Sequence, residues 1–191
     1  CFDAVLKLGR LLPDRPSAGV GKLAGRFVFD VWGGGKYANI ARDMERAARY
    51  GLTDAMLIVH NWQRWGYDYR LPDIWPPNPQ YGTLEDMQAI GQVCREYGIL
   101  WGPHDNYIDY YPDAEDFSYD HICFDAARQP VKAWLNEGRG ARSYKFRPDH
   151  IMPFVQRNLR LIKEGIAPTA YFIDVFASGR PVDYWDRTGN L

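Results

Sequence analysis

The sequence predicts an α/β protein: the first half, about four strand–helix units, of a parallel (β/α)8 barrel. Three observations favour this fold. Apolar strand-like segments alternate with amphipathic helical segments, which is the pattern of parallel strands joined by right-handed crossovers. The strand-like segments are nearly continuous apolar runs, as expected for strands buried on both faces. The connections after the strands are long, and in barrels of this kind such loops build the active site.

The first unit contains a strand expected at residues 27–32 (FVFDVW) and a helix expected over 37–50. Apolar residues recur at helical spacing in the second segment, and Gly51 is a typical C-terminal stop. The GGGK run between them lacks the rest of a phosphate-binding loop, and no GxGxxG follows the first strand. A doubly wound nucleotide-binding sheet is therefore the less favoured alternative.

The second unit begins with a strand at 55–60 (AMLIVH), followed by an aromatic and proline-rich loop over 61–82. Thr83 is predicted to cap the next helix, with Asp86 in the third helical position of a capping box. We expect that helix to end near Tyr97.

The third unit begins with a strand at 99–104 (ILWGPH), followed by a long excursion over 105–147. The third helix is expected to open at Pro148 and to stop at Gly165, since proline suits a first turn and glycine a C-terminal end. The fourth strand is expected at 170–176.

Two segments are predicted: an N-terminal lead-in over 1–26, and the half barrel over 27–191. A complete barrel takes about 250 residues, so we expect the chain to be a fragment of a longer protein. The net charge of −1 gives no pull toward nucleic acid or anionic membrane, and no apolar run is long enough to span a bilayer. Three cysteines without a CxxC argue against a disulfide framework or zinc knuckle.

Polar side chains end every predicted strand, and the carboxyl ends of parallel strands meet at one edge of a sheet. Each could have a structural role, as a turn residue, a loop-amide acceptor or a core histidine. Asp174 is the strongest functional candidate, because a carboxylate within an apolar strand needs hydrogen bonds or a cation to offset its desolvation. The strand-end residues are Asp30, Trp32, His60, Asn61, Trp62, His104, Asp105, Asn106 and Asp174.

The loops after the second and third strands are rich in aromatic residues interleaved with polar ones. The segment NWQRWGYDYRLPDIWPP contains Trp62, Trp65 and Trp75. Flat rings can stack on the C–H faces of sugars while amides and charged groups bind hydroxyls, so Trp65 is also an expected substrate contact. The alternative is a hydrophobic cluster that covers the barrel mouth.

Four segments resemble the catalytic barrels of bacterial glycoside hydrolases of the endo-α-N-acetylgalactosaminidase type (glycoside hydrolase family 101) and relatives. These segments are FVFDVWGG, AMLIVHNWQRWGYD, GILWGPHDNYIDYYPD and YFIDVFASG, and the resemblance covers residues 27–178. More distantly, the chain is similar to α-galactosidase and α-glucosidase barrels, which place an aspartate nucleophile at the end of the fourth strand.

The resemblance implies a retaining glycoside hydrolase, acting on α-galactoside or α-N-acetylgalactosaminide linkages, with Asp174 as nucleophile. It implies an acid/base carboxyl group about 5 Å away, which in such families comes from a later strand and so from beyond Leu191. The other strand-end residues would contact an oligosaccharide or glycan substrate, with no metal or other cofactor. A secreted or cell-surface location in a bacterium would suit carbohydrate metabolism of this kind.

Two other functions stay open at this point. His60, His104 and Asp174 could hold a divalent ion in a metal-dependent hydrolase built on the same barrel. The chain could also be a non-catalytic carbohydrate-binding protein. A stoichiometric metal would favour the first, and unchanged glycan affinity in Asp174→Asn would favour the second.

Overall fold

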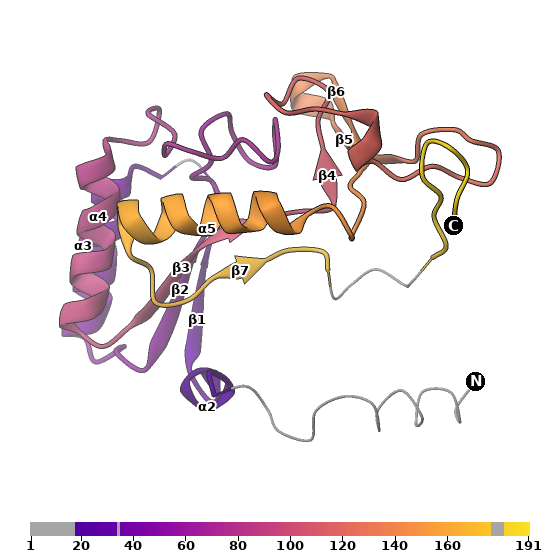
Figure 1. Cartoon of the computed structure of the whole chain (residues 1–191). Coiled ribbons are helices and arrows are strands. Elements are labelled where there is room, and N and C mark those ends of the chain that lie inside the picture. Colours follow the sequence, from indigo (N-terminus) through magenta and orange to yellow (C-terminus); the bar gives the residue numbers. More distant parts are fainter. Residues whose placement is uncertain (1–17, 34, 177–181) are drawn as a thin grey trace.

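Four parallel strands form the central sheet of the computed structural model, which describes residues 18–33, 35–176 and 182–191 (Figure 1). The strand order is β1–β2–β3–β7, and each neighbouring pair is parallel. The strands are β1 Phe27–Val31, β2 Ala55–Val59, β3 Leu100–Asp105 and β7 Phe172–Ile173. The sheet curls into half of a (β/α) barrel, so the predicted fold class is confirmed.

Helices alternate with these strands: α2 Val20–Leu23, α3 Tyr37–Arg49, α4 Leu84–Glu96 and α5 Met152–Ile166. Helix α3 packs against α4, and α4 packs against α5. The main hydrophobic core lies between this helical layer and the strands; Met44, Leu57, Ile90, Trp101 and Ile162 are among its buried members.

The predicted boundaries of α3 and α4 are confirmed by their cap geometry. The Thr83 hydroxyl accepts a hydrogen bond from the Asp86 backbone N–H at 3.1 Å, and the Asp86 carboxylate accepts one from the Thr83 N–H at 2.9 Å. After the two helices, Gly51 and Gly98 take φ values of +92° and +70°, the left-handed conformation that glycine adopts without strain.

The start of α5 differs from the prediction at Pro148. The backbone N–H of Arg147 still donates to the carbonyl of His121 at 2.9 Å, which ties this part of the chain to the preceding excursion. The helix therefore begins at Met152, with Pro153 in its first turn, where proline is tolerated.

The end of α5 also differs, because Gly165 lies inside the helix and Ala167, at φ +43°, ends it. Gly165 is required for packing: a Cβ at this position would lie 2.1 Å from Cη2 of Trp75. The sequence predicts that the helix ends at Gly165, but this glycine instead allows the 61–82 loop to approach the helix closely.

A second, antiparallel sheet occupies the excursion between β3 and α5, and the sequence did not predict it. Its order is β4–β6–β5, with β4 Asp109–Tyr110, β5 Lys132–Asn136 and β6 Ala141–Lys145. Two 3₁₀ turns accompany it, η1 Tyr119–His121 and η2 Glu137–Arg139. A separate aromatic core that includes Tyr110, Phe146 and Phe154 connects this sheet to α5.

Strand β7 is shorter than the predicted 170–176. Beyond its two residues, the Asp174 N–H still donates to the carbonyl of Asp105 at 2.9 Å, so the pairing with β3 extends to Asp174. The close approach depends on Gly102, since a Cβ there would lie 2.4 Å from the carbonyl oxygen of Ala170. The next residue, Val175, has φ +66°, a strained value for a β-branched residue, and the strand ends there.

Most of the predicted N-terminal lead-in, residues 1–17, lies outside the described residues. The described remainder holds α2, and Arg26 donates from Nη1 to the carbonyls of Ala55 and Gly98 at 3.2 Å each. Cys94 and Cys123 are buried free thiols. No helix in the described part of the chain has the length and apolar character of a membrane span.

Candidate active site at the carboxyl ends of the strands

The carboxyl ends of β3 and β7 bring Asp174 and His104 together with Asp68 from the 61–82 loop. The Nε2 atom of His104 lies 3.5 Å from Oδ2 of Asp174 and 3.7 Å from Oδ1 of Asp68. His104 is fully buried, whereas 36% of the Asp174 side chain is exposed. Asp174 is therefore the member of this group that solvent or a ligand can reach.

The ends of β1 and β2 adjoin this group through stacked rings. The Trp32 indole stacks on the His60 ring at 3.9 Å between centroids, and His60 stacks on His104 at 4.7 Å. Asp30 holds both sides of the first pair: its Oδ2 accepts from Nε1 of Trp32 at 2.8 Å, and its Oδ1 lies 2.6 Å from Nε2 of His60. These four residues, together with Asp68 and Asp174, are called the strand-end site below: Asp30, Trp32, His60, His104, Asp68 and Asp174.

Three other predicted contacts are buried next to the site and hold its residues in position. Trp62 is fully buried and donates from Nε1 to the His104 carbonyl at 2.6 Å. Asp105 is also fully buried and accepts a hydrogen bond from the Tyr171 hydroxyl. Asn106 donates from Nδ2 to Asp68 at 2.9 Å and to Asp109 at 2.7 Å. Their burial makes these residues positioning groups for the loop and the strands.

Two predicted contacts remain, Asn61 and Trp65. Asn61 is half-buried at the start of the 61–82 loop. Trp65, 37% exposed, lines a separate pocket with Asp73 and Arg157. The structure thus does not bring Trp65 to the strand-end site.

Two residues of the site were missed as candidates, although the loop containing them was noted. Tyr67 stacks on His104 at 5.1 Å between centroids, and Asp68 follows it with a side chain that is only 6% exposed. The loop turns sharply here, with Asp68 at φ +42° and Arg70 at φ +57°. The sequence shows a carboxylate among the aromatic residues of this loop, which could have marked Asp68 as a candidate. A loop has no periodicity, however, to indicate which of its side chains point inward.

Burial dominates the electrostatics of the site. It raises the pKa of Asp68 to about 7; a hydrogen bond from Asn106 opposes this, and the carboxylates of Asp109, Asp105 and Asp174 add to it. Burial likewise raises the pKa of Asp105 to about 6. It lowers the pKa of His104 to about 4, although the Asp174 carboxylate opposes this shift. At neutral pH His104 is therefore an uncharged imidazole, and Asp68 is shared between its protonated and ionised forms.

The same three side chains form a possible metal-ligand set. Asp68, His104 and Asp174 each offer a ligand atom, and these atoms lie within 4.8 Å of one another. Two carboxylates and an imidazole suit a divalent ion. The sequence predicted His60, His104 and Asp174 as the alternative metal-ligand set. In the structure His60 stacks on His104, and Asp68 is the third ligand of the group instead.

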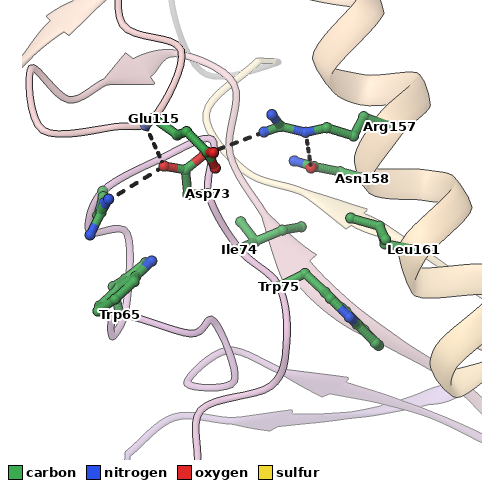
Figure 2. A pocket seen from close by; sticks show the side chains of 9 residues that line it. Trp65, Asp73, Ile74, Trp75, Glu115, Arg157, Asn158 and Leu161 are labelled. Carbon is green, nitrogen blue, oxygen red and sulfur yellow. Dashed lines mark hydrogen bonds and ion pairs between the residues drawn. The ribbon is translucent and has the colours of Figure 1, made fainter.

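The separate pocket that contains Trp65 lies between the 61–82 loop and α5 (Figure 2). Its volume is about 250 Å³. Figure 2 shows Asp73 near its centre, with Glu115 beside it and Arg157 reaching in from the helix. We call it the outer pocket; its lining residues are Trp65, Arg70, Asp73, Ile74, Trp75, Glu115, Arg157, Asn158 and Leu161.

No family model matches the chain. Among solved structures, it is similar to the α-N-acetylgalactosaminidase NagBb from Bifidobacterium bifidum. The ligand-free NagBb structure is 25% identical with a TM-score of 0.71, over 83% of this chain and 30% of that chain. Its GalNAc complex is 24% identical with a TM-score of 0.76, over 87% and 30%. A maltogenic α-amylase, AmyB from Thermotoga neapolitana, is 12% identical with a TM-score of 0.60, over 81% and 40%.

These likenesses show that the chain has the fold of glycoside hydrolase barrels. The chain spans less than a third of the length of the NagBb structures. The neighbours do not single out glycoside hydrolase family 101, so that finer resemblance stays a prediction.

Proposed function

We propose that this chain is the nucleophile-bearing half of a retaining glycoside hydrolase barrel that acts on α-galactoside or α-N-acetylgalactosaminide linkages. The observation that carries the proposal is the placement of Asp174: a partly exposed carboxylate at the end of β7, beside the buried Asp68 and the uncharged His104. The likeness to the barrel of the α-N-acetylgalactosaminidase NagBb supports this substrate class.

In this proposal, Asp174 attacks the anomeric carbon of the bound sugar. The bond from that carbon to the leaving-group oxygen breaks, and the oxygen takes a proton from an acid that these residues do not supply. Water then hydrolyses the glycosyl ester of Asp174, and two inversions give net retention. The acid/base is proposed to come from a part of the full-length protein beyond Leu191.

The backbone around Asp174 supports a fixed attack geometry. Its N–H donates to Asp105 at 2.9 Å, and its own Oδ1 accepts from the Val175 N–H at 2.9 Å. The strained φ of Val175 follows at once, and such outliers are found preferentially at functional sites. Both hydrogen bonds hold the carboxylate at a defined position at the strand end.

The neighbouring groups suit a sugar. Asp68 and the uncharged His104 are buried beside Asp174, so they place little positive charge near the nucleophile. Trp32, 56% exposed and held by Asp30 and His60, offers a flat apolar face. Tyr67 adds a phenol whose pKa is raised by burial and then by the nearby carboxylates, including Asp174, so it stays protonated and can donate a hydrogen bond.

Hydrolysis of aryl α-galactosides and aryl α-N-acetylgalactosaminides by the full-length protein tests the proposal, with the first-formed anomer read by NMR. We expect hydrolysis with an α-configured first product. Absence of hydrolysis on every aryl glycoside tried, or a β-configured first product, would overturn it.

A second candidate function is a metal-dependent hydrolase, favoured by the close grouping of Asp68, His104 and Asp174. Elemental analysis of the purified protein, with activity before and after chelation, separates the two. A stoichiometric divalent ion whose removal abolishes hydrolysis would favour the metal mechanism, and an active metal-free protein would exclude it.

A further inference from the structure

The outer pocket has a composition that the proposed catalytic role does not use. Its charged lining consists of two arginines, Arg70 and Arg157, and two acids, Asp73 and Glu115, so the formal charges balance. Ile74, Trp75 and Leu161 add an apolar wall. A balanced set of donors and acceptors beside an apolar wall favours a neutral ligand that both donates and accepts hydrogen bonds.

The polar wall is held in place before any ligand binds. Asp73 Oδ2 accepts from the Glu115 N–H at 2.7 Å, and its Oδ1 lies 3.5 Å from Nη2 of Arg157. Arg157 and Asn158 both donate to the carbonyl of Pro72 at 3.1 Å. A wall fixed in this way lowers the entropic cost of binding.

The apolar wall is fixed as well. Trp75 lies so close to α5 that a Cβ at Gly165 would meet its ring at 2.1 Å. Figure 2 shows Ile74 and Trp75 on the loop facing Leu161 on the helix. The ring of Trp65 forms the opposite side, with the Arg70 guanidinium 4.4 Å from its centroid.

One donor in the pocket has no hydrogen-bond acceptor. Within the described residues, Nε of Arg70 is buried and has no hydrogen-bond acceptor, since Oδ2 of Asp73 lies 3.6 Å away. Buried donors of this kind are normally satisfied. The Arg70 side chain as a whole is 31% exposed, so its guanidinium group can meet a ligand hydroxyl. Glu115 is exposed at the rim and offers an acceptor.

We propose that the outer pocket is a second carbohydrate-binding site, which takes one neutral sugar residue apart from the strand-end site. Hydroxyls would meet Arg70, Asp73 and Glu115, and the C–H face would lie on the apolar wall. The volume of about 250 Å³ approaches the lower end of small-molecule pockets, roughly 300 Å³. The proposal does not depend on Asp174 or on hydrolysis.

An NMR titration of the ¹⁵N-labelled full-length protein with sugars tests the proposal. The signal followed is the indole N–H of Trp65, which a Trp65→Phe variant assigns. The probes are galactose, N-acetylgalactosamine and glucose. We expect at least one sugar to shift the Trp65 signal saturably, with the same midpoint in an Asp174→Asn background. A Trp65 signal that none of the three sugars shifts would overturn the proposal.

Two substitutions, one in the outer pocket and one outside it, test the assignment further. Glu115→Ala should weaken binding by about tenfold, the effect of losing one hydrogen bond to a charged group. Glu164→Ala removes an exposed glutamate of α5 that is not part of the pocket and should leave the midpoint unchanged. Equal midpoints for wild type and Glu115→Ala would contradict the assignment. Because Glu115 is exposed, both variants should fold, which circular dichroism checks.

Discussion

Two aspartates of the 61–82 loop, five residues apart, occupy contrasting environments. Asp68, in the strand-end site, is 6% exposed, and its ion-pair contact among the described residues is with His104. Asp73, in the outer pocket, is 13% exposed but lies within 3.6 Å of Arg70 and Arg157. Burial raises the pKa of both; hydrogen bonding to the Glu115 N–H and the two arginines oppose the rise at Asp73.

The difference indicates what each region can do. Carboxylates that are desolvated without a cation have perturbed pKa values, and such groups gather preferentially at reactive sites. Carboxylates balanced by arginines form a stable polar wall suited to recognition. Under the two proposals made above, one loop supplies a reactive region on one side and a binding region on the other.

The largest expected effect is on Asp174, the exposed acid of the reactive region. Asp174→Asn should lower kcat for aryl glycosides by about a thousandfold or more, since loss of a nucleophile removes the covalent route. Asp54→Asn, at a side chain that is 80% exposed outside both regions, is the matched control and should change kcat little. Similar losses in the two variants would remove the basis for assigning Asp174.

Asp68→Asn should change how stability depends on pH. Burial raises the folded-state pKa of Asp68 from its ordinary value of 3.8 to about 7, which makes the ionised form unfavourable in the native state. The native state therefore gains stability below pH 3.8 and loses it as pH rises through 7. By this linkage, Asp68→Asn should be more stable than wild type at pH 8 by up to about 4 kcal/mol.

Urea unfolding of both proteins from pH 4 to pH 8 measures this effect. His104, whose pKa is lowered to about 4, changes the free energy of unfolding in the opposite direction. It stabilises the native state above pH 6.5, and this stabilisation is lost as the pH falls through 4. Comparing the variant with the wild type at each pH cancels this effect. The advantage of Asp68→Asn should shrink toward pH 4. An advantage that is independent of pH would contradict the burial of an ionisable Asp68.

Gly102→Ala should separate the two strands that bring His104 and Asp174 together. Its Cβ would lie 2.4 Å from the backbone oxygen of Ala170, which cannot move as a side chain can. We expect a loss of about 3 kcal/mol in the free energy of unfolding, together with lower activity. Gly138→Ala, where the nearest atom would be 3.7 Å away, should be nearly neutral in the same urea titration.

Gly165→Ala perturbs the outer pocket in the same manner but more mildly. The new methyl group must displace the Trp75 ring, while alanine in a helix regains about 1 kcal/mol over glycine. We expect the affinity of the outer pocket for sugar, followed at Trp65, to fall roughly threefold. Hydrolysis, which depends on Asp174, should be retained. Gly21→Ala in α2, which meets open space, serves as control.

The sequence predicted the parallel half barrel and the strand ends that face a common edge. The short apolar run AMLIV of β2, bounded by turn and polar residues, indicates a buried strand, and the Thr83 cap predicts the start of α4. Asp30, His60, His104 and Asp174 come together as the strand order requires.

The loops could not be predicted in the same way. Trp65 and Tyr67 are two residues apart in an aromatic run, yet one lines the outer pocket and the other stacks on His104. Gly66, between the two, has φ +113°, and composition does not reveal how the backbone turns there. The antiparallel sheet was missed because β4 is two residues long and β5 is largely exposed, so neither shows a clear apolar pattern.

The central claim is that Asp174 forms a covalent bond to the sugar. Treatment of the full-length protein with a 2-deoxy-2-fluoro-α-galactosyl fluoride, followed by peptide mass spectrometry, tests it most directly, because the fluorine slows breakdown of a glycosyl ester. We predict one added fluorosugar, on the peptide that contains Asp174. A fluorosugar on another carboxylate, or turnover of the reagent with no label at Asp174, would contradict it.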